Sequence, residues 1–95
     1  MLTILKGSDL FFRLIWPSTE WLPMDLTGWT VEPYDEIGLI RGKVELTIEE
    51  PLTGTVMGSI PWDDGFPYGS TMGFRVLIRN EPLQFSTPQI KVDVQ

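Results

Sequence analysis

Apolar and polar residues alternate with a period of two along most of this chain. Four runs show the alternation most clearly: DLFFRLIW at 9–16, GKVELTIEE at 42–50, TMGFRVLIRN at 71–80 and IKVDV at 90–94. One face of the first run carries Leu10, Phe12, Leu14 and Trp16. The other face carries Phe11, Arg13 and Ile15. This pattern is typical of strands with one dry face and one wet face, as in antiparallel sheets.

Weaker versions of the pattern predict four more strands, at Thr3–Lys6, Trp29–Tyr34, Thr55–Ser59 and Leu83–Phe85. No stretch of helical length has a period of 3.6. Eight Pro and nine Gly divide the chain into short segments, and PLTG at 51–54 and NEP at 80–82 are predicted to be tight turns. The pattern predicts one all-β domain over 1–95, a sandwich or small barrel, without repeats or linkers.

Composition limits the partners, catalytic residues and metal sites that we expect. The net charge of −6 disfavours nucleic acid and anionic membranes as partners. The chain has no His and no Cys, so we expect no Ser-His-Asp triad, no zinc site, no disulfide and no enzymatic activity. No cofactor is expected. The N-terminal run MLTILKGSDLFFRLIW mixes Gly, Ser, Asp and Arg with apolar residues, so we expect no signal peptide and synthesis in the cytoplasm.

Three pairs of neighbouring acids are the candidates for metal or acid–base chemistry: Asp35-Glu36, Glu49-Glu50 and Asp63-Asp64. Calcium binding, best at Asp63 and Asp64, and a glycosidase pair are the functional alternatives. Neighbouring strand residues point to opposite faces, so such pairs seldom converge on one ion. We expect these acids to solvate loops and sheet edges, with no metal site.

Aromatic residues gather in the segment SIPWDDGFPYGS at 59–70, which is rich in Pro, Gly and Asp. Its rings are Trp62, Phe66 and Tyr68, and Trp21 lies in an earlier loop. If these four side chains are exposed, they form a protein contact surface. Two alternatives stay open: the rings fold back to close the end of the core, or they stack on a sugar.

The stretch LPMDLTGWT at 22–30 is predicted to be a structural corner, comprising Pro23, Asp25, Leu26, Thr27, Gly28 and Trp29. Asp25 and Thr27 suit caps of backbone N–H groups, and Gly28 permits a positive φ. Leu26 is expected to plug the space between two sheets, and Trp29 to start a strand. Pro17 is expected to end the preceding strand, with STEW at 18–21 forming a hairpin loop.

Residues 6–16 and 22–32 resemble the start of small β-sandwich proteins of tailed bacteriophages. The pattern reads Gly-Asp-aromatic, a strand ending in Trp, a loop, then Pro-x-Asp-Leu-Thr-Gly-aromatic-Thr. The matching residues are Gly7, Asp9, Phe11, Trp16, Pro23, Asp25, Leu26, Thr27, Gly28, Trp29 and Thr30. Ser8 is an insertion, and downstream Asn80-Glu81-Pro82 stands in place of a glycine-containing turn.

The chain is similar in this pattern to the N-terminal attachment domain of baseplate upper proteins and related tail proteins. The resemblance implies an Ig-like β-sandwich of about seven to eight short strands. It also implies a virion protein, assembled in the host cytoplasm, that acts as a tail or baseplate adaptor. Its partners would be other virion proteins, including copies of itself. Alternatives are a capsid decoration or head-to-tail protein and, from another class, a carbohydrate-binding module.

Overall fold

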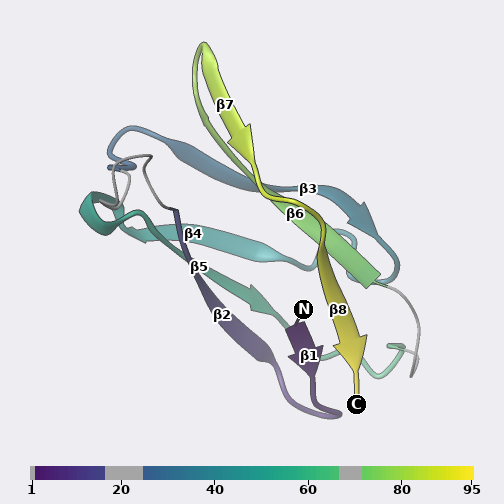
Figure 1. Ribbon diagram of the computed structural model, residues 1–95. Coiled ribbons are helices and arrows are strands. Elements are labelled where there is room, and N and C mark those ends of the chain that lie inside the picture. Colours follow the sequence, from purple (N-terminus) through teal and green to yellow (C-terminus); the bar gives the residue numbers. More distant parts are fainter. Residues whose placement is uncertain (1, 17–24, 67–71) are drawn as a thin grey trace.

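The computed structural model describes residues 2–16, 25–66 and 72–95 (Figure 1). Within these ranges the protein is all-β, with eight strands and one single-turn 3-10 helix, η1. They are β1 (Leu2–Ile4), β2 (Leu10–Ile15), β3 (Thr30–Ile37), β4 (Glu45–Glu50), η1 (Pro51–Thr53), β5 (Thr55–Ile60), β6 (Met72–Asn80), β7 (Leu83–Ser86) and β8 (Ile90–Val94). The described part contains no helix long and apolar enough to cross a membrane.

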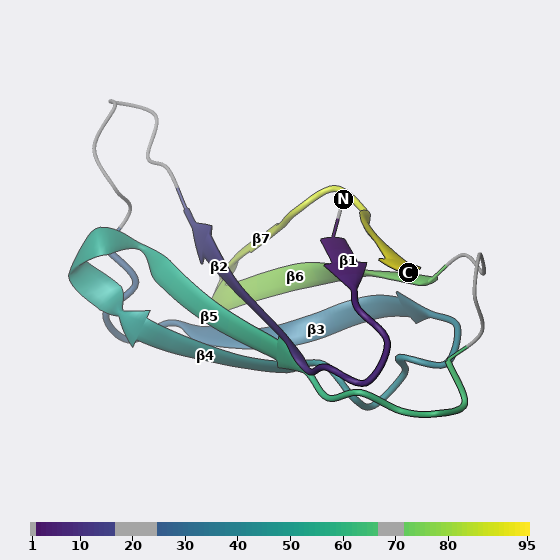
Figure 2. The ribbon, with the colours of Figure 1, turned by 90° about the horizontal axis from the view of Figure 1, so that it is seen from below.

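The strands form two sheets that lie over each other (Figures 1 and 2). The first sheet has the order β1-β8-β6-β3, and β7 pairs with the second half of β6. The second sheet has the order β2-β5-β4. As predicted, the strands pair antiparallel, apart from β1, which runs parallel to β8. The first and last strands therefore lie side by side in one sheet.

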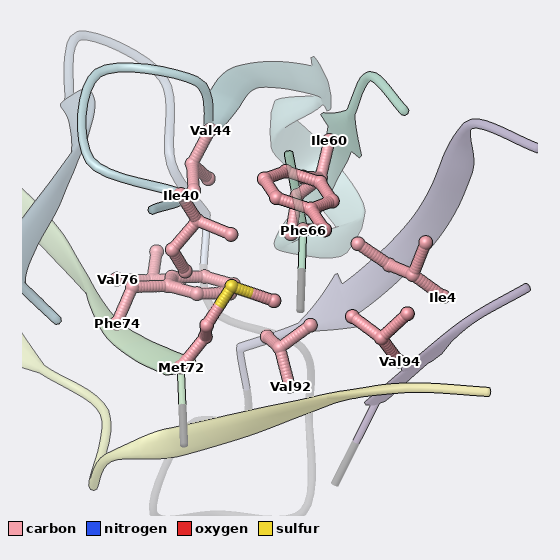
Figure 3. Close-up of a cluster of buried hydrophobic side chains, with 10 residues drawn as sticks. All are labelled: Ile4, Ile40, Val44, Ile60, Phe66, Met72, Phe74, Val76, Val92 and Val94. Atoms are coloured by element: carbon pink, nitrogen blue, oxygen red, sulfur yellow. The ribbon is translucent and has the colours of Figure 1, made fainter. Parts of the chain in front are cut away.

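The predicted alternation places the core between the sheets. Met72, Phe74, Val76 and Ile78, from one face of β6, are all buried. Figure 3 shows how side chains of both sheets and of the 38–44 connection meet in one cluster: Ile4, Ile40, Val44, Ile60, Phe66, Met72, Phe74, Val76, Val92 and Val94. Each such side chain contributes about 1.5–3 kcal/mol when fully buried.

A glycine on β5 seats β2 against the core. Gly58 lies opposite Phe12, and a Cβ at Gly58 would stand 2.1 Å from Cζ of the Phe12 ring. The ring occupies this space and approaches Phe74, with centroids 5.7 Å apart and planes tilted by 43°. The position of β2 therefore depends on Gly58 of the neighbouring strand having no side chain.

The predicted turns are tight connections. Residues 51–53 form η1, and Gly54 follows in the left-handed conformation with φ +65°. Its N–H donates to the Pro51 carbonyl at 3.1 Å. Glu81 and Pro82 join β6 to β7, where Asn80 faces Leu83.

The connection after β2 differs from the expectation. A hairpin loop was predicted there, but β2 pairs with β5 and β3 pairs with β6 in the other sheet. The chain therefore crosses between sheets, because both strands find their partners far along the sequence. Pro17 and the STEW segment lie outside the described residues.

Candidate functional site

The corner at 25–29 forms as its residue types predict. Asp25 Oδ1 accepts hydrogen bonds from the Thr27 backbone N–H at 2.9 Å and from Thr27 Oγ1 at 2.6 Å. The Thr27 hydroxyl, followed by the Thr27 N–H, lowers the pKa of Asp25. Gly28 has φ +83° in the third position of a turn closed by the Trp29 N–H, which donates to the Leu26 carbonyl at 3.0 Å. β3 begins at Thr30, one residue after Trp29.

Leu26 is the plug between the sheets that the sequence predicts. Its side chain is 1% exposed and packs with Val56 of β5 and Ile78 of β6, which belong to different sheets. The Leu26 N–H donates to the Pro51 carbonyl at 2.7 Å, which ties the corner to η1. Pro23 lies outside the described residues. The described part of this segment has a structural role.

Phe66 is not an exposed contact residue. It is 4% exposed and belongs to the core cluster, where Figure 3 shows its ring beside Ile60. Its N–H donates to the Asp63 carbonyl at 2.9 Å, and this turn directs the ring inward. The Lys43 ammonium lies 4.9 Å from the ring centroid and also pairs with the Asp63 carboxylate. The alternative in which a ring closes the end of the core is correct for Phe66.

Trp62 is half-buried and held from three sides. Its backbone N–H donates to Asp9 Oδ1 at 2.7 Å, and its indole N–H donates to Asp64 Oδ1 at 2.8 Å. Its ring meets Phe66 edge to face, with centroids 5.7 Å apart and planes at 89°. These two rings therefore form no common flat platform for a sugar. Trp21 and Tyr68 lie outside the described residues, so the proposed four-residue surface stays a prediction for them.

The acid pairs make local contacts. Asp35 pairs with Arg75 at 3.5 Å, and Glu36 Oε2 accepts the Gly42 N–H at 2.6 Å. Asp63 Oδ1 accepts the Gly65 N–H at 2.7 Å. Over residues 2–16, 25–66 and 72–95, no three acidic side chains lie close enough together to hold a metal ion. Asp63 thus pairs with Lys43, and Asp64 accepts the indole N–H of Trp62.

A surface that the site predictions missed lies on the outer face of the β2-β5-β4 sheet. Phe11 is 70% exposed and Ile15 is 58% exposed, on either side of Arg13. Phe11 faces Ser59 of β5, and Ser59 faces Glu45 of β4. The small Ser59 leaves a hollow of about 250 Å³, which is lined by Asp9, Phe11, Glu45, Ser59 and Pro61.

The signal for this surface was present in the sequence. Alternation placed Phe11 and Ile15 together with Arg13 on one face of their strand, and the wet face of a strand seldom carries two large apolar residues. The sequence analysis gave more weight to aromatic residues in loops. An aromatic residue on the wet face of a regular strand was the better indicator of exposure.

Comparison with known proteins finds no relative of this chain. The chain matches no protein-family model, and no curated protein and no solved structure is significantly similar to it.

Proposed function

We propose that this protein is a structural subunit of a tailed-bacteriophage virion, a tail or baseplate adaptor that binds neighbouring virion proteins. One observation carries the protein-binding part: Phe11 and Ile15 stand exposed on a regular strand whose other face packs on the core. Large apolar side chains held on a rigid surface are typical of protein contact sites.

The strand order supports an Ig-like assignment. In constant-type Ig domains one sheet combines strands A, B, E and D, and the other combines C, F and G. Lettered along this chain, β2-β5-β4 corresponds to B-E-D, and β3 and β6 correspond to C and F. β7 and β8 both pair with β6 on the side where G would lie, and β1 departs from the constant-type order by pairing with β8. Ig-like sandwiches occur in many cell-surface and assembly proteins, so the fold is compatible with an attachment role.

The phage assignment rests on the resemblance of residues 6–16 and 22–32. The geometry at 25–29 supports it in one respect: the Asp-Leu-Thr-Gly-aromatic motif has a physical function as a corner that joins both sheets. A packing motif of this kind identifies an architecture more securely than an activity.

Immunogold electron microscopy of particles of the phage whose genome encodes this chain tests the proposal. Antibody raised against the chain should label the tail end. Label over the head would instead favour a capsid decoration or head-to-tail protein. If denatured particles contain no such chain by immunoblot, the virion proposal is wrong.

A glycan array tests the carbohydrate-binding alternative. Specific binding that a Trp62→Ala variant abolishes would favour this class. The perpendicular Trp62 and Phe66 rings lead us to expect no binding.

A further inference from the structure

Sheet edges expose unpaired backbone groups, and most edges of this protein carry features that discourage pairing. β4 has Glu45, Glu49 and Glu50, with a register shift after Ile48. β3 contains Pro33 and a register shift between Tyr34 and Ile37. β1 has three residues, and β7 has four and follows Pro82.

β2 lacks these features. All six of its residues pair with β5 in an unbroken register, and none of them is Pro or Lys. Figure 1 shows β2 at the border of its sheet, and no described residue pairs with its outer side. Its one charged side chain is Arg13, between the exposed Phe11 and Ile15. A regular, apolar edge of this kind is a template for another strand.

The direction of the backbone groups can be assigned. The Trp16 N–H donates to the Gly54 carbonyl at 2.8 Å, which continues the β2–β5 register. Hydrogen-bonded and non-hydrogen-bonded pairs alternate along an antiparallel ladder, so Leu14, Phe12 and Leu10 also bond toward β5. The N–H and C=O groups of Phe11, Arg13 and Ile15 therefore point away from β5.

The side chains along this edge are self-complementary. Asp9, Phe11 and Arg13 follow one another on the outer face, as acid, aromatic ring and base. Asp9 and Phe11 line the same hollow. When two copies of this segment run antiparallel with Phe11 opposite Phe11, Asp9 of each copy lies opposite Arg13 of the other. Opposite charges and aromatic pairs across two strands stabilise their pairing.

We propose that two copies of this chain associate through antiparallel pairing of their β2 edges, with the two-fold axis at Phe11. The backbone groups of Phe11 bond to those of Phe11 in the second copy. Asp9 of each copy faces Arg13 of the other, so the interface contains two ion pairs. The two three-stranded sheets join into one sheet of the order β4-β5-β2-β2-β5-β4. The arrangement is isologous and closes at two copies.

The pairing is short, and this limits the affinity of the dimer. In this register Ile15 falls opposite Gly7 of the second copy, where φ is +81° and the chain turns away. About five residues per chain take part, less than a standard interface of roughly 1,200–2,000 Å² requires. Each copy also carries a net charge of −6. We therefore expect a dimer that dissociates on dilution and that gains strength when other subunits hold the copies in place.

Cysteine cross-linking tests the register, because the chain has no Cys of its own. A hydrogen-bonded antiparallel pair has Cα atoms about 5.5 Å apart, within disulfide reach. Phe11→Cys should form a disulfide-linked dimer under mild oxidation. Leu52→Cys is the matched control, since Leu52 is 73% exposed and lies in η1, away from the edge. Equal cross-linking of both variants would overturn the register.

A charge exchange tests the ion pairs. Arg13→Glu alone and Asp9→Lys alone each place two like-charge pairs across the axis, and each should raise the dimer Kd about tenfold or more. An equimolar mixture should restore a one-to-one heterodimer, because every positive side chain then faces a negative one. Sedimentation velocity with one variant labelled measures this. Circular dichroism first verifies that the Asp9→Lys variant is folded, since Asp9 also accepts the Trp62 N–H.

This inference deepens the proposed function by naming the surface through which copies meet, and the two can fail separately. A wild-type chain that stays monomeric to about 1 mM, with no cross-linking of Phe11→Cys, overturns the β2 pairing even if gold labels the tail. A dimer with the expected variants, found in a chain absent from particles, upholds the pairing and overturns the virion role.

Discussion

The two edges of the three-stranded sheet, β2 and β4, flank the same strand and differ on their outer faces. Both send alternate residues inward: Phe12 and Leu14 from β2, and Leu46 and Ile48 from β4. Outward, β2 presents Phe11, Arg13 and Ile15, whereas β4 presents Glu45, Thr47 and Glu49. The inner faces fix where each strand lies. The outer faces determine whether its edge accepts another strand.

The same contrast occurs between two neighbouring residues. Phe11 and Phe12 share a residue type and a strand, yet Phe12 rests on Gly58 and Phe74 while Phe11 stands in solvent. Residue type alone therefore says little about which ring stabilises the monomer. Position in the two-residue period distinguishes them.

The largest expected effect is the loss of the inner ring. Phe12→Ala should lower the free energy of unfolding by about 3 kcal/mol or more, because it leaves a cavity between Gly58 and Phe74. Phe11→Ala is the matched control and should change stability by about 0.5 kcal/mol at most. Urea denaturation measures both. Similar losses in the two variants would show that β2 does not pack as described.

Leu26 packs on Val56 of the central strand β5 and on Ile78 of the opposite sheet. Leu26→Ala should cost about 2–5 kcal/mol of unfolding free energy. The dimer Kd of the folded fraction should not change, because the residue lies on neither outer face. Thermal and urea melts, followed by sedimentation, test this. A raised Kd would mean that the corner also shapes the β2 edge.

Substitutions can give β4 the apolar outer face of β2 and give β2 a charged one. Glu45→Phe with Glu49→Ile gives β4 an apolar outer face, and we expect new concentration-dependent association with little change in Tm. Phe11→Lys gives β2 a charged side chain, and we expect loss of its association. Light scattering across a concentration series measures both. Continued monomer behaviour of the β4 variant would point to the register shift after Ile48 as the main barrier to pairing.

The smallest expected effect is at Asp25, which lies outside both edges. Thr27 lowers the pKa of Asp25 in the folded protein. The ionised group therefore stabilises the fold above its unfolded pKa of about 3.9, and this contribution is lost as the pH falls through the lower folded pKa. Asp25→Asn should lower Tm slightly at pH 7, and its difference from wild type should shrink toward pH 3. A Tm difference that does not change with pH would mean that the hydrogen bonds to Thr27, and not the charge of Asp25, account for the effect.

Local patterns carried much of the fold. Alternation placed every predicted strand near its observed position, and Asp25, Thr27 and Gly28 form the turn that their side chains favour. The candidate site was less predictable. Phe66 lies in a Pro- and Gly-rich segment and yet is buried, because Lys43 and Asp63 from different parts of the chain hold its turn.

What the sequence by itself determined is the set of short-range features: period-two strands, tight turns at 51–54 and 80–82, and a capped corner at 25–29. These depend on interactions between residues a few positions apart. Tertiary structure decided which strands pair, that β1 runs parallel to β8, and that β2 lies at an edge with Phe11 exposed. Strand pairing joins residues as far apart as Leu2 and Val92, and no local periodicity encodes such partners.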